Sequence, residues 1–508
     1  MMIKHPALAR PLLLALLAGA AALGGCMVGP NYGGPPLAAP TTVQAGRFHR
    51  ADTAPTTAAP PPSAWWLALN DAELTRLIDD ALASSPNLKA AEARVRNARA
   101  TLREDRTKLL PQGGAMGLYA HAKLPSSIDK LGQALGASST TGTPVNIPSQ
   151  LDLYAATLDA SWEIDLFGGE RRAIEGAKAT AGAQQATYED AQVRLAAEVA
   201  GAYVNLRDSQ RRLTLVKTAA DLQGRMLALT QERRAGGTAS DADVERLSTQ
   251  LSQTRADLPA LAAAIDQYKD ELAVLTGREP GALDAELDTP AALPLPPQTV
   301  AVGDPAAFLR RRPDIRQAER QLAASNAAIG QSVAAYFPTV KLFGTLGFGS
   351  TDGAKLFSSD NFNALGAPQL SWNILSFPEI NAKVREAKAG RDAAEALYQQ
   401  AVLAALQDAE DSLSRYGHQR ENVMELSQAE ASAARAAALT RQRFAGGTVS
   451  LIDSLDAERQ RVLTEQSLEQ AEAMLTNDYV TLQKSLGLGW GAQPPTAGAS
   501  VGADRTAR

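Results

Sequence analysis

The chain has 508 residues, a formal net charge of −5 and an aromatic content of only 5%. This length is enough for two to four ordinary domains, and the weak negative charge argues against a surface that binds nucleic acid. The four histidines and the single cysteine lie too far apart in sequence to suggest a metal site. No phosphate-binding or nucleophile motif is present. The sequence therefore predicts no enzyme, no metal and no resident cofactor.

Residues 1–25 have the features of an export signal, with basic residues ahead of a short apolar stretch at 11–25. Cys26, the only cysteine, follows a Leu-Gly-Gly sequence that looks like a bacterial lipobox, although a small residue closing a signal would look the same. We expect a covalent lipid, palmitate included, on Cys26. Met27 rather than aspartate follows, which in lipoproteins usually goes with outer-membrane sorting. Acyl chains tether a protein without making it span the bilayer.

After Cys26 no run of 18 apolar residues occurs, so no helix is expected to cross a membrane. If the chain spans a membrane, it must do so with strands closed into a barrel. Residues 26–64 are rich in proline, alanine and threonine and are expected to be extended. Residues 491–508 lack an apolar pattern and are expected to be disordered.

The remaining sequence is a duplication, with copies at 65–277 and 306–490 joined by a linker at 278–305. An offset of 227 aligns Pro86, Glu92 and Pro111 with Pro313, Glu319 and Pro338. An offset of 210 aligns Trp162, Phe167 and Gly277 with Trp372, Phe377 and Gly487. The difference lies in a Ser/Thr/Gly/Pro-rich loop at 125–149 of the first copy.

Each copy is expected to contain a helix, two strands, a very long helix, a glycine elbow and a shorter helix. The strands are predicted at about 112–124 and 151–166, and at about 338–350 and 368–377. They alternate apolar and polar residues, which is typical of a wall with lipid outside and water inside. A soluble antiparallel sheet over a core would show the same alternation.

The predicted helices favour the membrane wall over the soluble sheet. The segment 169–236 contains no proline and repeats apolar residues every seven positions, so it predicts a rod of roughly 100 Å. The helices at 87–110 and 240–276, laid end to end, nearly match it, which predicts a two-stranded pillar. Four strands cannot close a barrel, because bacterial barrels need about eight or more. Two copies would give a barrel filled by its own side chains, so an open pore needs three or more.

The elbows at 234–240 and 444–450 reverse the chain, and tight reversals favour glycine. Ser240 with Asp243, and Ser450 with Asp453, have the spacing of helix capping boxes. Capping alone explains Asp453. It does not explain Asp456, whose counterpart in the first copy is arginine.

Several segments together resemble outer-membrane efflux lipoproteins, the NodT/OprM-like branch of the TolC-like channels. They are "CMVGPNYGGP" at 26–35, the Trp65-Trp66 pair, the segment 309–330 with "YFP" at 336–338, and the duplicated "AGGT" elbows. The resemblance covers nearly the whole mature chain. It implies a mainly α fold with a membrane β part, a homotrimer with a 12-stranded β-barrel on a long α-helical barrel. It also implies an outer-membrane location, in contact with outer-membrane lipid and extending into the periplasm.

The resemblance further implies that the elbows dock a periplasmic adaptor (membrane fusion) protein and that an inner-membrane pump of the RND or MFS type supplies the energy. The implied docking residues are Arg234, Gly236, Gly237, Thr238, Arg443, Gly446, Gly447 and Thr448. The implied gate at the periplasmic entrance comprises Asp453, Asp456, Arg459, Ile452 and Leu455. Trp162 and Trp372 are expected at the membrane interface. Turn-forming glycines and a solvated acidic helix face are the plainer interpretations.

We therefore expect a passive conduit that exports drugs or other small toxic compounds. One alternative is an exit duct for type I protein secretion. Another, of a different class, is a lipid-anchored periplasmic coiled-coil adaptor or scaffold. The adaptor class normally carries one hairpin flanked by lipoyl-like domains, and the two hairpins found here disfavour it.

Overall fold

A computed structural model describes residues 27–123 and 150–491. The expected signal peptide, the lipid site at Cys26, the loop at 125–149 and nearly all of the expected disordered tail lie outside these residues. The described chain forms two compact units. Unit 1 contains the chain up to Gly34, Asn97–Ala181 and Gln321–Ala394, and unit 2 contains Pro35–Arg96, Gly182–Arg320 and the chain from Glu395. Both repeats contribute to each unit.

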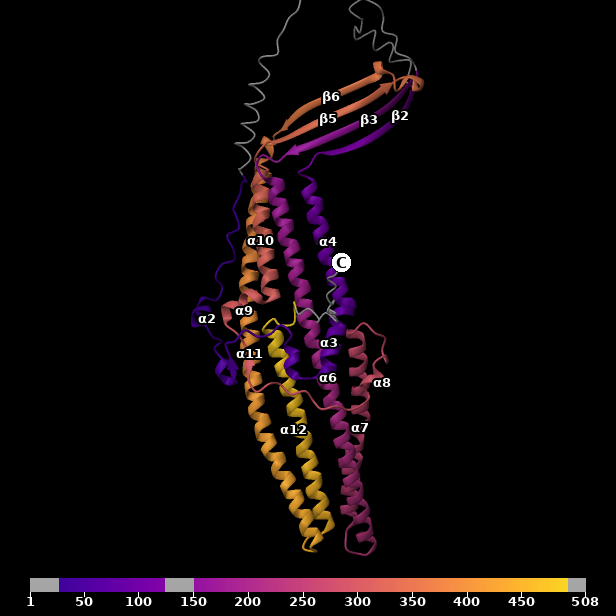
Figure 1. Ribbon diagram of the computed structural model, residues 1–508, viewed down its shortest axis with the longest axis vertical. Helices are drawn as coiled ribbons and strands as arrows, with labels where there is room; N and C mark the ends of the chain where they lie inside the picture. Colours follow the sequence, from indigo (N-terminus) through magenta and orange to yellow (C-terminus); the bar gives the residue numbers. More distant parts are fainter. Residues whose placement is uncertain (1–26, 124–149, 492–508) are drawn as a thin grey trace, which may run out of the picture. The chain divides into compact units, whose positions relative to one another are not determined.

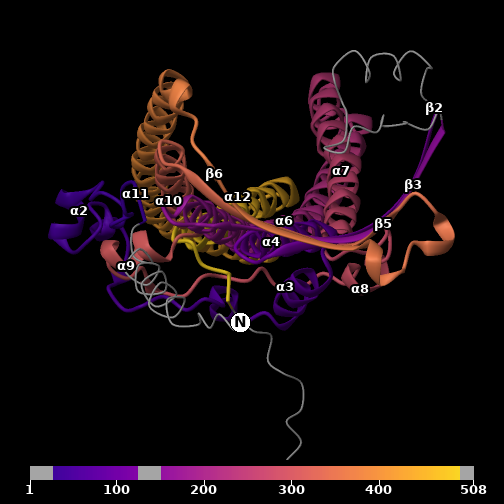
Figure 2. The same cartoon turned by 90° about the horizontal axis from the view of Figure 1, so that it is seen from above.

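Unit 1 contains one antiparallel sheet with the strand order β2-β3-β5-β6 (Figure 1). The strands are β2 (Gln112–Lys123), β3 (Gln150–Ile164), β5 (Thr339–Ser350) and β6 (Phe362–Ser371). Seen from above, they curve together along one arc (Figure 2). Within the described residues β2 pairs only with β3 and β6 only with β5, so each of these strands has an unpaired edge.

The last strand differs from its prediction. It was expected at about 368–377, but β6 is Phe362–Ser371, and a 3-10 turn, Ile374–Ser376, leads into the next helix. Pro368 lies in the middle of β6, opposite Leu342. A proline is tolerated there because β6 is an edge strand and does not need that N–H for a further neighbour. Similarly, β3 ends at Ile164, two residues before its predicted end.

Four helices contribute residues to both units: α4 (Pro86–Thr107), α6 (Gly169–Ala235), α10 (Pro313–Ala334) and α11 (Phe377–Ala445). Unit 2 adds α3 (Ala72–Ser84), α7 (Asp241–Leu275), α9 (Pro305–Arg311) and α12 (Leu451–Ser485). These bounds confirm the predicted long helices. None of the helices within the described residues is both long and apolar enough to cross a bilayer.

The core of unit 2 follows the predicted seam of α6. Val199 and Leu206 are fully buried and Ala220 is nearly so. The end of α7 lies against the start of α4, where Gly277, with φ of 74°, packs on the Ser84 carbonyl. Gly487, with φ of 69°, packs in the same way on Arg312 at the start of α10. Unit 2 therefore shows the predicted end-to-end placement of the shorter helices in both repeats.

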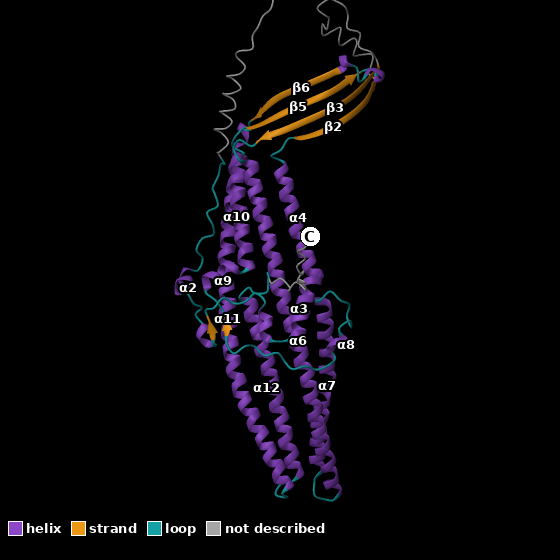
Figure 3. Cartoon of the chain, viewed as in Figure 1, coloured by secondary structure: helices purple, strands orange, loops and turns teal. Residues whose placement is uncertain are grey.

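The segment before Trp65 is only partly extended. It includes a short helix, α2 (Pro40–Ala45), and a short strand, β1 (Thr56–Thr57), which pairs in parallel with β4 (Val300–Ala301) of the linker (Figure 3). Phe48 is buried edge-on against Phe308. The Glu410 carboxylate accepts hydrogen bonds from the backbone N–H groups of His49 and Arg50, at 2.7 and 2.8 Å. These contacts fasten the segment to unit 2.

Candidate functional site

The two elbows have the same backbone. In the first, the N–H groups of Gly237 and Thr238 donate to the carbonyls of Arg234 and Arg233, at 2.9 and 2.8 Å. In the second, Gly447 and Thr448 repeat these bonds with Phe444 and Arg443, at 2.9 Å each. Only the second glycine of each pair is left-handed, with φ of 75° at Gly237 and 71° at Gly447. Such bonds satisfy the last carbonyls of a helix, so glycine is required at one position of each pair.

Both predicted capping boxes are present. The Ser450 hydroxyl accepts from the Asp453 N–H at 3.2 Å, and the Asp453 carboxylate accepts from the Ser450 N–H at 3.0 Å. Ser240 and Asp243 make the same reciprocal bonds in the first repeat. Hydrogen bonds from the serine hydroxyl and backbone hold the pKa of the Asp453 carboxyl below its usual range, and nearby Arg233 and Arg443 act in the same direction. Asp453 thus has a defined structural role.

The predicted docking residues lie at the surface of the two elbows. Arg234, Gly236, Gly237 and Thr238 are exposed, as are Arg443, Gly446 and Gly447. Arg234 forms an ion pair with Asp241 at the start of α7. The Thr238 and Thr448 hydroxyls donate to the preceding arginine carbonyls at 3.0 Å, so they also support their own turns.

An open cavity of about 430 Å³ lies where the first elbow faces the start of α12. Its charged lining comes from Arg233, Asp243, Arg246, Asp453, Asp456 and Arg459. As expected, Asp456 pairs with Arg459, at 2.8 Å. Asp456 is half-exposed in this pair, whereas its first-repeat counterpart Arg246 turns to Asp243 at 3.3 Å. The structure therefore brings both predicted gate aspartates to one cavity with three arginines.

The apolar residues of the predicted gate occupy a different environment. Leu455 is only 9% exposed and packs with Met226 of α6 and Leu247 of α7. Ile452 is partly buried and packs on the same cluster. Leu455 therefore joins α12 to the first hairpin instead of facing open space.

The strand register separates two chemically different faces of the sheet. One face carries Leu158, Trp162, Leu342, Leu346 and Phe348, together with Ala156, Ala160, Ile164, Val340, Phe362, Ala364 and Leu370. The other carries the polar residues Asp159, Ser161, Glu163, Lys341, Thr345 and Gln369, together with the apolar Met116, Leu118, Phe343 and Leu365. Lys341 and Glu163 form an ion pair at 3.1 Å on this second face. The predicted alternation holds in β3 from Leu158 to Ile164, but it does not extend to β2, where Met116 and Leu118 lie on the face of Asp159.

The predicted interface tryptophans lie at the strand ends next to the helices. Trp162 is 36% and Trp372 is 51% exposed. At the opposite end of the apolar face, the Tyr119 and Tyr154 rings are 4.9 Å apart. Beyond them the face becomes polar, with His121 Nδ1 2.8 Å from the Asp152 carboxylate.

Sequence reasoning missed the environment of the chain that follows Cys26. Arg172 of α6 is 1% exposed and donates to the carbonyls of Val28 and Gly29, both at 3.1 Å, and to the Asn31 side chain at 2.8 Å. Gly29 packs directly on Gly330 of α10. Gly29, in the segment "CMVGPNYGGP" at 26–35, was the sequence signal for such a close approach, because glycine has no side chain to prevent it. Its partner Arg172 has no sequence signal of its own.

No group of three metal-ligating side chains occurs within residues 27–123 and 150–491. Comparisons with known proteins identify relatives that share this architecture. A family model described as "Outer membrane efflux protein" matches residues 77–278 and 305–488, one range overlapping each repeat.

Two relatives and one solved structure illustrate the extent of the similarity. The solvent efflux pump outer membrane protein SrpC of Pseudomonas putida is 30% identical, over 92% of this chain and 96% of its own length. The pyoverdine export outer membrane protein OpmQ of Pseudomonas aeruginosa is 30% identical, over 94% and 97%. The solved structure of the outer-membrane channel OprN is 32% identical, covers 92% of this chain and 100% of its own, and has a TM-score of 0.80. The chain therefore belongs to the outer membrane efflux protein family.

Proposed function

We propose that this protein is one subunit of a homotrimeric, passive export conduit that crosses the outer membrane and extends into the periplasm. The observation that carries the proposal is the two-faced sheet with an unpaired edge at each side. Unpaired edges must be covered or joined to another chain. Three copies joined edge to edge would supply 12 strands, which is within the range of outer-membrane barrels.

The two faces give the wall its orientation. Leu158, Leu346 and Leu370 on the apolar face are 53%, 48% and 68% exposed, which is unfavourable in water and suits lipid. Tyr154 and Trp162 are eight residues apart on this face, or about 27 Å along the strand. That is close to the apolar band of about 25 Å between two aromatic girdles in outer-membrane proteins. The face with Lys341, Glu163 and Asp159 would then line the water-filled interior.

The gate proposal rests on the cavity at the start of α12. In a trimer, Asp453 and Asp456 from three copies would place up to six carboxylates around one axis, a ring that favours cations. The Asp456–Arg459 pair would hold this entrance in its resting state. Leu455 would support the closed gate without lining it, because it packs α12 on Met226 and Leu247. Opening then requires α12 to move away from the first hairpin.

The elbows are the proposed docking sites for a periplasmic adaptor, since they are exposed and end each helical hairpin. Energy would come from an inner-membrane pump of the RND or MFS type. Relatives named for solvent efflux and pyoverdine export favour small compounds as cargo over the polypeptides of a type I secretion duct.

The proposed lipid on Cys26 fits the first described residues. Val28 N–H donates to the Phe167 carbonyl at 3.1 Å, at the end of the chain leaving β3. Arg172 fixes the next carbonyls, so a lipid on Cys26 would be held near the strand ends that carry Trp162.

Single-channel recording of the purified protein in planar bilayers tests the proposal. The native protein should form small, cation-preferring pores. The double variant Asp456→Ala/Arg459→Ala should raise the conductance and reduce the cation preference, whereas Asp241→Ala/Arg234→Ala, an ion pair at the elbow outside this cavity, should change neither. A protein that forms no pore would refute the conduit, and unchanged conductance in the first variant would refute the gate.

A further inference from the structure

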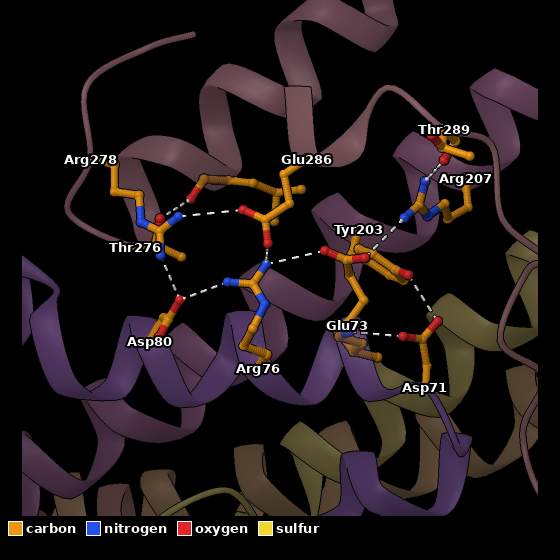
Figure 4. A network of polar contacts seen from close by, with 12 residues as sticks. Asp71, Glu73, Arg76, Asp80, Tyr203, Arg207, Thr276, Arg278, Glu286 and Thr289 are labelled. Carbon is orange, nitrogen blue, oxygen red and sulfur yellow. Dashed lines mark hydrogen bonds and ion pairs between the residues drawn. The ribbon is translucent and has the colours of Figure 1, made fainter. Parts of the chain in front are cut away.

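Charged and apolar side chains differ in how they are covered. In unit 2, Arg76 and Arg278 each pair with Asp80 and with Glu286, so these four charged side chains satisfy one another (Figure 4). In unit 1, by contrast, large apolar side chains remain exposed on the polar face of the sheet, which is the face of Asp159. They are Leu118, Leu153, Phe343 and Leu365, which are 41%, 39%, 42% and 60% exposed.

Lipid does not account for this exposure. In the proposed conduit, the opposite face with Leu158 and Leu346 contacts lipid, and the polar face lines the water-filled interior. The interior of an outer-membrane barrel is normally polar, and exposed apolar side chains that gather in a patch mark a contact surface. Their arrangement in the assembled conduit therefore decides whether they form such a patch.

The internal duplication indicates how the sheets of two copies join. Under the offset of 227, β2 and β5 begin and end at equivalent residues. The register within each strand pair is also the same, because Gln112 opposite Ser161 is equivalent to Thr339 opposite Ser371 under the offsets of 227 and 210. The strands of the two repeats therefore form equivalent units, and we expect the contact between repeats to recur between copies.

The contact between the repeats is the pairing of β3 with β5, in which Thr157 lies opposite Gly347. In the other repeat, the equivalent of Thr157 is Ala367 of β6, and the equivalent of Gly347 is Ala120 of β2. If β6 of one copy pairs with β2 of the next in the same way, Ala367 lies opposite Ala120 of the next copy.

This register brings apolar side chains of two copies together. Within one copy, Phe343 lies opposite Ala367, and Ala120 lies opposite Leu153. Pairing of Ala367 with Ala120 of the next copy therefore completes a row of four apolar side chains, about 14 Å across at the usual strand spacing. Each copy supplies half of the row, so the row is complete only where two copies meet.

We propose that this row, with its apolar neighbours along the strands, is a contact site on the interior wall for the apolar part of exported compounds. The patch comprises Phe343, Leu365 and Ala367 of one copy and Leu118, Ala120 and Leu153 of the next. This inference rests on the proposed function and adds a substrate class to it.

The charge beside the patch narrows that class. Asp159 lies in one row with Thr345 and Leu365, two strands away from Leu365. Two strand spacings correspond to about 10 Å, so a carboxylate stands near the apolar patch. A compound that joins an aromatic or aliphatic group to a positive charge would match both features, with the apolar group on the patch and the cation toward Asp159.

Disulfide cross-linking tests whether two copies share the patch. Ala367→Cys combined with Ala120→Cys places two cysteines directly opposite each other, within reach of a disulfide, and should give covalently linked copies on a non-reducing gel. Ala367→Cys combined with Met116→Cys is the matched control, because Met116 lies four positions from Ala120, or roughly 13 Å along the strand. Linked copies in the control pair, or in neither pair, would overturn the shared patch and leave the conduit proposal untouched.

Single-channel recording tests the contact itself with two cations that share a charged group. Benzyltrimethylammonium carries an aromatic ring and tetramethylammonium does not. In the native protein, benzyltrimethylammonium should halve the K⁺ conductance at an about tenfold lower concentration, because its ring leaves water on the patch. Phe343→Ser/Leu153→Ser alters one side chain from each half and should abolish this difference.

Two further variants show whether the apolar character is what matters. Phe343→Leu keeps an apolar side chain and should preserve part of the difference between the two cations. Thr157→Ala/Thr345→Ala changes the same wall outside the patch, is the matched control, and should preserve all of it.

The outcomes separate the patch from the conduit. A protein that forms no K⁺ pore would refute the conduit. Pores in which the native protein does not distinguish the two cations would overturn the patch alone. The patch would also be overturned if Phe343→Ser/Leu153→Ser kept the full difference, or if Thr157→Ala/Thr345→Ala lost it, because the ring would then be sensed elsewhere.

Discussion

Trp162 and Trp372 make the same hydrogen bond in the two repeats. Trp162 Nε1–H donates to the Leu109 carbonyl at 2.9 Å, and Trp372 Nε1–H donates to the Tyr336 carbonyl at 3.0 Å. Each acceptor precedes the first strand of its repeat, and each tryptophan ends or follows the second. The indole therefore ties the entry of each strand pair to its exit.

Replacing Trp162 by phenylalanine keeps a large ring at the strand end but removes the donor. We expect each of Trp162→Phe and Trp372→Phe to lower the free energy of unfolding by about 1 kcal/mol. Because the two bonds are separate, their effects should add in the double variant. Heat or denaturant unfolding of the purified protein in detergent measures this. Equal stability of all three variants and the native protein would show that the bonds serve no structural role.

The glycine pairs of the elbows should differ sharply in their tolerance of alanine. Gly447 has φ of 71° and Gly446 has no positive φ, while an added Cβ at Gly447 meets nothing within 4 Å. Gly447→Ala should therefore destabilise the elbow by about 1–2 kcal/mol through backbone strain alone. Gly446→Ala is the matched control and should be close to neutral. Amide hydrogen exchange at 442–452 measures the difference, and equal exchange in both variants would contradict it.

The sequence predicted the long helices, the elbows and the capping boxes, because local signals determine these elements. The absence of proline from 169–236 and the serine-to-aspartate spacing at 450–453 are examples. It misplaced β6, because pairing of Phe362 with Phe348 fixes that strand and no local pattern around Pro368 reveals the pairing. The buried side of Leu455 and the carbonyls bound by Arg172 depend on contacts between segments far apart in sequence. The periodicity of α12 does not indicate which of its faces meets α6.

The capping box of α12 should stay intact in acid until the pH falls below the range in which aspartate usually titrates. Hydrogen bonds from Ser450 lower the folded-state pKa of Asp453 from 3.8. A depressed carboxyl pKa contributes stability that is present above the unfolded value and is lost as the pH falls through the folded value. The protection of amides at the start of α12, meaning the exchange rate relative to that of an unfolded peptide at the same pH, should therefore be constant from pH 7 to pH 4 and fall only below about pH 3.8. Asp453→Ala should show the lower protection from pH 7 to pH 4 and should converge with the native protein in stronger acid, and a loss of protection already at pH 5 in the native protein would contradict the assignment.

Arg172 should be needed to hold the residues that follow Cys26. Arg172→Ala leaves the Val28 and Gly29 carbonyls, whose bonds to Arg172 are partly buried, without their donor, a loss of roughly 1.5–3 kcal/mol for bonds to a charged group. Arg172→Lys should rescue little, since one ammonium cannot reproduce the planar fork of donors. Arg171→Ala, a neighbouring and partly exposed arginine, is the control. Limited proteolysis within 27–35 should accelerate in both Arg172 variants and not in the control.

Leu455 offers a way to loosen the proposed gate without touching its charges. Leu455→Ala removes a buried side chain from its contacts with Met226 and Leu247 and should destabilise the attachment of α12 by about 2–4 kcal/mol. Leu451→Ala, one turn earlier and 37% exposed, is the matched control and should cost little. If α12 moves when the entrance opens, Leu455→Ala should raise the frequency of open-channel events in planar bilayers while leaving the single-channel conductance of each event unchanged. A larger conductance with an unaltered opening frequency would mean that Leu455 lines the pore, because only a lining residue changes the width of an already open path.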